Sequence, residues 1–170
     1  MLAHELSTGA LWEEIRMKGG AYGAFAHGDS LESCFSLATY RDPKPLRSLE
    51  SFPVILKKIA KMYMGASKAK NSRLNDDLEK MIIGTYSQDT KPRANSEKGT
   101  VDFFRYLYGV DDSSRKRKLE RLISINADNL ADAYRALAAQ KPVNPVIIAS
   151  MKDAQQAAKA LGVEPQILPV

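Results

Sequence analysis

Cysteine is nearly absent from this sequence, because Cys34 is the only one among 170 residues. A single cysteine excludes a disulfide within the chain and any zinc site built from several cysteines. Cys34 lies in an apolar run, so we expect it to be a small core residue and not a nucleophile.

Long apolar runs and an N-terminal export signal are also lacking. No run approaches the ~18 apolar residues of a membrane-spanning helix, and no basic stretch followed by an apolar one opens the sequence. We therefore expect a soluble chain with no membrane partner. Its compartment stays open, with the cytoplasm and the lumen of an organelle as candidates.

Charge of one sign is in only slight excess, with 25 Lys+Arg against 20 Asp+Glu and a formal net charge of +5. The densest basic run is Arg115–Lys118, at the start of a predicted helix, where its charges would fan around the axis. Glu120 and the acidic pair Asp111 and Asp112 partly neutralise the run, and no aromatic residues alternate with it for stacking on bases. The pattern favours a solvated surface over a polyanion-binding face, and nucleic acid is not a favoured partner.

Histidine is scarce as well, since the sequence holds only His4 and His27. His4 precedes Glu5 on a predicted helix, which raises the hypothesis of a metal site. A zinc-protease helix would need a second histidine at position 8 or the inverted His-x-x-Glu-His order, and position 8 is Thr8. We therefore expect His4 and Glu5 to be an exposed helical pair, and we expect this chain to bind no metal or other cofactor.

Helical periodicity dominates what the sequence does contain. The predicted helices cover residues 2–18, 46–63, 75–83, 100–108, 113–125, 126–140 and 152–161, with connections at 65–73 and 85–99. Pro53 lies inside the second pattern, so this helix either begins near Pro53 or is kinked there. The residues expected to face the core from the third and fourth helices are Leu78, Met81, Ile82, Phe103, Phe104 and Leu107.

Strand-like patterns are few. Segments 21–28 and 31–40 are joined by the turn residues Gly28–Ser30 and predict an antiparallel hairpin. Apolar residues of both parities in the second segment indicate a strand that could be covered on both faces. A Val-Ile-Ile run predicts a buried strand over 143–150, and residues 166–170 are expected to form a short terminal strand.

These elements predict an α+β domain over residues 1–170, with helices packed on one face of a mostly antiparallel sheet. Three or four strands are few for so many helices, and the first helix carries an apolar stripe that needs a sheet. We infer that the first strands of the domain are absent, and that the chain is the C-terminal part of the last domain of a larger protein. An open sheet edge would favour self-association.

One stretch combines glycines with two side chains suited to binding. Residues 16–23 read RMKGGAYG, with Gly19 and Gly20 between Arg16 and Tyr22. The stretch follows a helix and enters a strand, which is the reverse of the strand-to-helix turn in a dinucleotide-binding fingerprint. By itself it indicates a glycine turn more strongly than a binding site.

Other segments accompany this stretch. Residues 11–23 read LWEEIRMKGGAYG, residues 39–43 read TYRDP, residues 81–85 read MIIGT, and Lys98-Gly99 opens a helix. Together they resemble the C-terminal half of the pitrilysin/insulinase family of zinc metallopeptidases, in its presequence-protease branch, which includes falcilysin-like enzymes. The first two segments are long and specific, and the later part matches mainly in layout.

The resemblance implies a metallopeptidase half-domain with ferredoxin-like elements, in a hydrolase that degrades peptides. Family members enclose a chamber between two homologous halves, and the C-terminal half supplies an arginine and a tyrosine that reach the bound peptide. By motif and spacing these are Arg16 and Tyr22. They would donate hydrogen bonds to substrate carbonyls, with the tyrosine stabilising the developing oxyanion. Gly19 and Gly20 would let the backbone lie close to an extended peptide.

The zinc-binding motif of the family is absent from this sequence. The resemblance therefore implies a non-catalytic, substrate-binding segment that is inactive alone. Its implied partners are a peptide substrate and the N-terminal catalytic half of the same enzyme, where the zinc would be bound. The alternative is a stand-alone binding or assembly module with the same fold.

Overall fold

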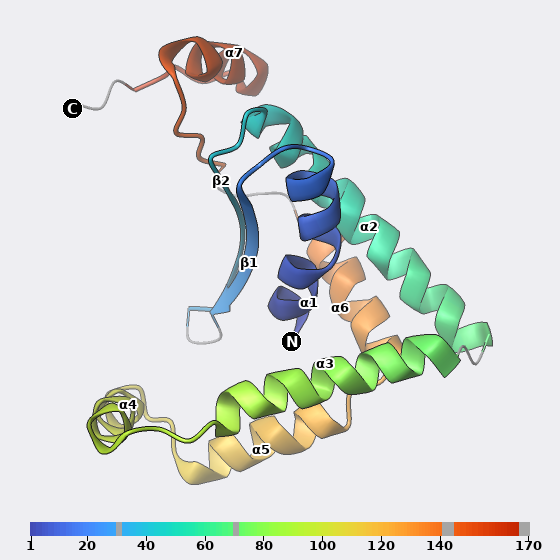
Figure 1. Ribbon diagram of the computed structural model, residues 1–170, viewed down its shortest axis with the longest axis vertical. Helices are drawn as coiled ribbons and strands as arrows, with labels where there is room; N and C mark the ends of the chain where they lie inside the picture. Colours follow the sequence, from blue (N-terminus) through green and yellow to red (C-terminus); the bar gives the residue numbers. More distant parts are fainter. Residues whose placement is uncertain (30–31, 70–71, 141–144, 167–170) are drawn as a thin grey trace.

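The computed structural model describes residues 1–29, 32–69, 72–140 and 145–166. Within these residues the fold is mostly helical with one antiparallel hairpin, an α+β arrangement with a small sheet (Figure 1). The elements are α1 (Leu2–Thr8), the π-helix η1 (Trp12–Met17), β1 (Gly23–Asp29), β2 (Cys34–Tyr40), α2 (Pro45–Ala69), α3 (Ser72–Thr90), α4 (Asn95–Leu107), α5 (Asp112–Ile123), α6 (Ala127–Ala139) and α7 (Met151–Leu161).

The segment predicted as one helix over 2–18 is divided in two. Gly9 interrupts it, with φ −111° and ψ −102°, and the chain continues as the π-helix η1. The apolar stripe explains the division, because Leu6, Leu11 and Ile15 are all buried although the first spacing is one residue longer than the second. The break and the wider π-turn absorb the extra residue, so all three side chains reach the same core.

The hairpin has one covered face. β1 and β2 pair antiparallel in a register whose end pairs are Gly23–Tyr40 and Asp29–Cys34. The hydroxyl of Ser7 on α1 accepts a hydrogen bond of 2.9 Å from the backbone N–H of Ala26, which ties α1 to β1. On the other face Cys34 is exposed. The predictions that Cys34 is a core residue and that its strand is covered on both faces are therefore wrong, because among the described residues only one side of the hairpin has a layer packed on it.

The core lies where α1, η1, α2, α6 and the hairpin meet, and α2 and α6 pack along one another (Figure 1). The most deeply buried side chains are those of Leu6, Leu11, Ile15, Tyr63, Leu130 and Tyr134. Each buried leucine or isoleucine contributes about 2 kcal/mol to the hydrophobic stabilisation. The sheet in the described residues has only two strands. The prediction that the helices pack on one face of a larger sheet is therefore wrong for these residues, where the helices pack mainly on each other.

A hydrogen-bonded trio of Glu5, Tyr63 and Tyr134 crosses this core. The Tyr63 hydroxyl donates to Glu5 Oε1 at 2.5 Å, and the Tyr134 hydroxyl donates to Glu5 Oε2 at 2.6 Å. The two rings stack, with centroids 6.0 Å apart. Burial raises the pKa of Glu5, although both hydrogen bonds oppose that shift, and burial also raises the pKa of each tyrosine. The expectation that His4 and Glu5 form an exposed pair is wrong, because both are partly buried and Glu5 joins α1 to α2 and α6.

Two helices run further than predicted. α2 begins at Pro45, so it does not start at Pro53, which lies within it, and it extends over part of the predicted connection 65–73. α3 continues through the first part of the predicted loop 85–99 and ends at Thr90, two residues before Pro92. Polar residues there lie along a helix, since no proline or glycine interrupts the chain between Thr85 and Lys91.

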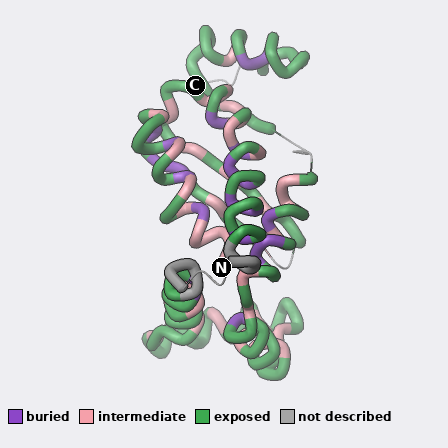
Figure 2. Tube along the Cα trace, turned by 90° about the vertical axis from the view of Figure 1, so that its right-hand side faces the viewer, coloured by how far each residue is buried: buried purple, intermediate pink, exposed green. Residues whose placement is uncertain are grey.

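The helices α3, α4 and α5, residues 72–123, form an arm on one side of the core (Figure 1). Leu78 is buried in the core cluster and Met81 and Ile82 pack against it, as predicted. α4 has no buried residue, and Figure 2 shows that the arm is mostly exposed. The prediction that Phe103, Phe104 and Leu107 face the core is wrong; these side chains are exposed, because nothing in the described part of the chain covers that face of α4.

The C-terminal segment differs from the prediction in one element. Residues 145–150 form no strand, and Val146 and Ile148 are 78% and 82% exposed, so the predicted buried strand is wrong over these residues. A strand needs a neighbour to bond, and none lies beside this segment in the described structure. α7 forms as predicted between its cap at Ser150 and Gly162. Residues 143 and 144, and all but the first residue of the predicted terminal strand 166–170, lie outside the described residues.

No helix in the described ranges is long and apolar enough to cross a lipid bilayer.

Candidate functional site

The candidate site begins on η1, which carries Arg16 on its exposed side. The two acidic residues of this helix are already engaged, because Lys18 pairs with Glu13 at 2.9 Å and with Glu14 at 3.1 Å. Lys58 of α2 also pairs with Glu14, at 3.2 Å, and these hydrogen bonds lower the pKa of the Glu14 carboxyl. Arg16 itself forms no ion pair with a described residue, so its guanidinium is available to a ligand.

The glycine pair turns the chain from η1 into β1, and both glycines have a structural reason. A Cβ at Gly19 would lie 2.4 Å from the carbonyl oxygen of Ile15. Gly20 has φ +86°, a conformation that other residues rarely adopt, and its N–H donates to the Arg16 carbonyl at 3.0 Å. The turn therefore fixes the backbone path between Arg16 and Tyr22 without any contribution from a ligand.

Tyr22 belongs to a cluster at the base of the hairpin, which we call the Tyr22 cluster: Tyr22, Tyr40 and Arg41. The two rings meet edge to face with centroids 6.0 Å apart, and the Arg41 guanidinium carbon lies 5.8 Å from the Tyr22 centroid and 5.5 Å from that of Tyr40. The backbone N–H of Tyr22 donates to the Arg41 carbonyl at 3.3 Å. Cation–π attraction of about 0.5–1 kcal/mol per exposed ring holds the tyrosines beside the arginine.

The conformation of Arg41 brings its side chain over both rings. Its φ is +47°, in the left-handed region, which costs a non-glycine residue about 1 kcal/mol or more. Such strain persists where the surroundings fix it, and it clusters at ligand-binding sites. Tyr22 and Tyr40 stay 65% and 52% exposed in spite of these contacts. The cluster is thus a fixed aromatic surface that a ligand can reach.

The structure brings together only part of the predicted site. Gly19 and Gly20 connect Arg16 to Tyr22 along the backbone, but the Arg16 side chain makes no hydrogen bond, ion pair or ring contact with the described residues. Tyr22 instead contacts Tyr40 and Arg41. Tyr40 and Arg41 lie in the TYRDP segment, but no role was predicted for them from the sequence. The signal that could have pointed to them is the Tyr-Arg-Asp-Pro turn directly after a strand.

The described residues do not fit a zinc ion. No group of three or more His, Cys, Asp or Glu side chains among them is placed to hold a metal. Glu5, the candidate nearest to a histidine in sequence, has both carboxylate oxygens bonded to tyrosine hydroxyls. We therefore derive no zinc-dependent step on this chain.

Comparison with known proteins gives one family match, and it includes both Arg16 and the Tyr22 cluster. The PreP C-terminal domain family matches residues 1–151. The chain is similar to presequence protease 1, chloroplastic/mitochondrial, of Arabidopsis thaliana, with 30% identity over 139 residues, which is 81% of this chain and 12% of that protein. It is also similar to the mitochondrial presequence proteases of Kluyveromyces lactis (32% over 130 residues; 76% of this chain, 12% of that protein) and Mus musculus (33% over 130 residues; 76% and 11%). The chain thus spans about one eighth of the length of these relatives.

Proposed function

The chain belongs to the PreP C-terminal domain family, and we propose that it is a non-catalytic, substrate-binding segment of a zinc metalloendopeptidase that degrades peptides. Presequence-like peptides are the substrate class, since the relatives it resembles are named presequence proteases. The N-terminal half of the enzyme supplies the zinc site, and this chain supplies no step at the metal.

The observation that carries the proposal is an exposed donor pair on a fixed backbone. The Arg16 guanidinium forms no ion pair with any residue that the structure describes, and the Tyr22 ring is held by Arg41 while most of its surface stays exposed. Arg16 donates to carbonyl oxygens of an extended peptide, which is a charge-assisted hydrogen bond. Tyr22 donates its hydroxyl proton to the oxyanion that develops at the scissile carbonyl, a contribution of ~3 kcal/mol for a well-placed donor.

The two residues differ in when they act. Arg16 binds the peptide in the ground state, so its loss weakens peptide binding. The hydrogen bond of the Tyr22 hydroxyl to an oxyanion exists only in the transition state, so removing that hydroxyl lowers turnover in the whole enzyme and leaves peptide binding nearly unchanged. Tyr40 and Arg41 position the Tyr22 ring.

Fluorescence polarisation of a labelled presequence-like peptide tests the proposal on this chain. We expect saturable binding that Arg16→Ala weakens by about tenfold, the loss of one charge-assisted hydrogen bond. Tyr22→Phe should bind as the unchanged chain does. Arg121→Ala on α5 is the matched control, because Arg121 is also an exposed arginine and lies on another element; it should change nothing.

Two outcomes would contradict the proposal. Equal losses in Arg16→Ala and Arg121→Ala would show only non-specific charge attraction. Peptide cleavage by the chain with zinc, abolished by a chelator, would show that it is not a non-catalytic segment.

A further inference from the structure

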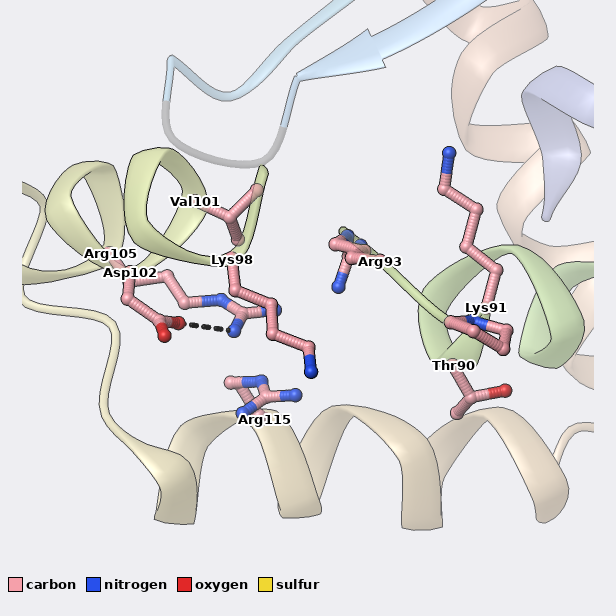
Figure 3. A pocket seen from close by; sticks show the side chains of 9 residues that line it. Thr90, Lys91, Arg93, Lys98, Val101, Asp102, Arg105 and Arg115 are labelled. Atoms are coloured by element: carbon pink, nitrogen blue, oxygen red, sulfur yellow. Dashed lines mark hydrogen bonds and ion pairs between the residues drawn. The ribbon is translucent and has the colours of Figure 1, made fainter. Parts of the chain in front are cut away.

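A basic pocket lies in the arm, between the end of α3, α4 and the start of α5 (Figure 3). Its volume is about 350 Å³. Its charged lining residues are Lys91, Arg93, Lys98, Arg105, Arg115 and the single acid Asp102. Neither Arg16 nor any residue of the Tyr22 cluster lines it, so the pocket is separate from the proposed peptide-binding surface.

The arginines of α4 and α5 keep donors free. Arg105 and Arg115 each use Nη1 on the aspartate three residues earlier, Asp102 and Asp112, at 2.9 Å in both pairs. A guanidinium has five N–H donors, so most of them remain for a ligand. Lys98 forms no ion pair with a described residue, and in Figure 3 it and Arg115 point toward one another across the pocket.

The loop between α3 and α4 adds an arginine with an unsatisfied atom. The Arg93 side chain is only 19% exposed, and its Nε is buried without a hydrogen bond although Glu97 Oε1 lies 3.4 Å away. Lys91 also pairs with Glu97, at 3.7 Å, and it extends away from the other basic groups in Figure 3. The five basic residues and their three acidic partners thus carry a net charge of +2, and among the described residues only Lys98 has no acidic partner.

We propose that this pocket binds an anion with two or more phosphate groups. Guanidinium groups match phosphate oxygens in a two-pronged geometry, and lysine adds a point charge. The basic groups come from a loop and two helices around one open space, so linked phosphates can bridge α4 and α5. No aromatic residue lines the pocket, so a nucleotide would be held by its phosphates and not by stacking of its base.

The residues of the basic run Arg115–Lys118 differ in whether they line the pocket. Arg115 lines the pocket, whereas Lys116 and Lys118 pair with Glu120 and Asp89, at 4.0 and 2.7 Å. Arg117 donates hydrogen bonds to the hydroxyls of Ser113 and Ser114, at 3.1 and 3.0 Å. One residue of the run contributes to a site that other segments complete.

Calorimetric titration of the full chain with inorganic pyrophosphate tests this site. We expect saturable binding with one ligand per chain, which Arg115→Gln weakens by about tenfold, as the loss of one charge-assisted hydrogen bond predicts. Lys116→Gln removes the same charge from the next residue of the same helix, outside the pocket, and should change the affinity less than about twofold because salt screens exposed charges. Lys98→Ala is a second variant in the pocket, and it should weaken binding while thermal melts show the fold intact.

Titrations with two further ligands, ATP and citrate, identify the source of the phosphate groups. Similar affinities for pyrophosphate and ATP would support the site with free polyphosphate as the ligand, and a clearly tighter ATP would support it with a nucleotide as the ligand. Citrate that binds as tightly as pyrophosphate would overturn the phosphate assignment. No saturable binding of pyrophosphate, or equal losses in Arg115→Gln and Lys116→Gln, would overturn the site.

Discussion

In the core, Tyr63 and Tyr134 are 1% and 0% exposed, whereas in the arm Tyr106 and Tyr108 are 84% and 58% exposed. Tyr63, Tyr134 and Tyr106 lie on the amphipathic helices α2, α6 and α4, and Tyr108 is the residue that caps the C-terminus of α4. The core tyrosines are covered because α1 brings Glu5 to their hydroxyls and the hairpin closes over the neighbouring leucines. Nothing in the described part of the chain covers the corresponding side of α4. An apolar helical stripe therefore marks a surface that can be buried, and contacts between segments decide whether it is.

The largest expected effect tests burial directly. Tyr134→Ala should lower the free energy of unfolding by ~3–5 kcal/mol, since it leaves a cavity and removes a donor to Glu5. Tyr108→Ala in the arm should change it by less than about 1 kcal/mol, because that ring is already solvated. Urea denaturation measures both. If Tyr134→Ala unfolds the chain altogether, Tyr134→Phe keeps the comparison testable, with an expected loss of ~1.5–3 kcal/mol for the hydrogen bond to a charged group. Equal losses at the two positions would break the distinction between core and arm.

Two glycine substitutions compare the backbone of the turn beside the core with the backbone of the arm. Gly19→Ala should destabilise the chain by ~1–3 kcal/mol, because its methyl group would lie against the Ile15 carbonyl. Gly99→Ala in α4 meets no atom within 4 Å and should stabilise the chain by up to ~1 kcal/mol through helix propensity. Thermal melts of the two variants should shift in opposite directions. A neutral Gly19→Ala would mean that the turn before Tyr22 relaxes more easily than the structure indicates.

The smallest expected effect is a difference between Glu5 and Asp111 in how their contributions to the free energy of unfolding depend on pH. Burial raises the pKa of Glu5, so its contribution to stability is fully present below the unfolded-state pKa near 4.5 and is lost as the pH rises through the higher folded pKa. In the arm, Asp111 caps α5 by accepting from the Ser114 N–H, and hydrogen bonds from Ser114 and Ser113 lower its pKa to about 2. Its contribution is present above its unfolded-state pKa near 3.8 and is lost as the pH falls through about 2.

Two substitutions separate these opposite slopes. Glu5→Gln should remove a contribution to the free energy of unfolding that decreases as the pH rises. The free energy of unfolding of the variant should therefore increase relative to that of the unchanged chain as the pH rises above 4.5. Asp111→Asn keeps a capping side chain but removes the term that is lost toward pH 2. Urea denaturation at a series of pH values measures both slopes. The same sign in both variants would contradict the assignment of Glu5 as a buried carboxyl and Asp111 as an exposed cap.

Much of the fold could be predicted because it depends on neighbours along the chain. The hairpin, the helices around Leu56, Leu130 and Ala157, and the glycine turn all follow from local periodicity and turn residues. The predictions that are wrong concern segments whose structure depends on residues far away in the sequence. Residues 145–150 have a strand-like composition but no strand beside them, and Phe103 has helical spacing but no covering layer.

The candidate site shows the same division. Arg16, Gly19, Gly20 and Tyr22 could be predicted as site residues because they lie in one continuous motif. Arg41 was given no role, since its position over the Tyr22 ring depends on strand pairing and on a left-handed backbone conformation that the sequence does not specify.

The helical periodicity, the glycine turn and the family to which the chain is similar follow from the amino-acid sequence, because each depends on residues that are close along the chain or on the order of motifs. Three features are visible only in the folded chain: which apolar faces are buried, that Glu5 accepts hydrogen bonds from tyrosines on α2 and α6, and that basic residues of α4, α5 and the loop before α4 line one pocket. The physical reason is that burial, hydrogen-bond satisfaction and charge density are properties of groups brought together by packing, and that packing is fixed by contacts across the whole chain.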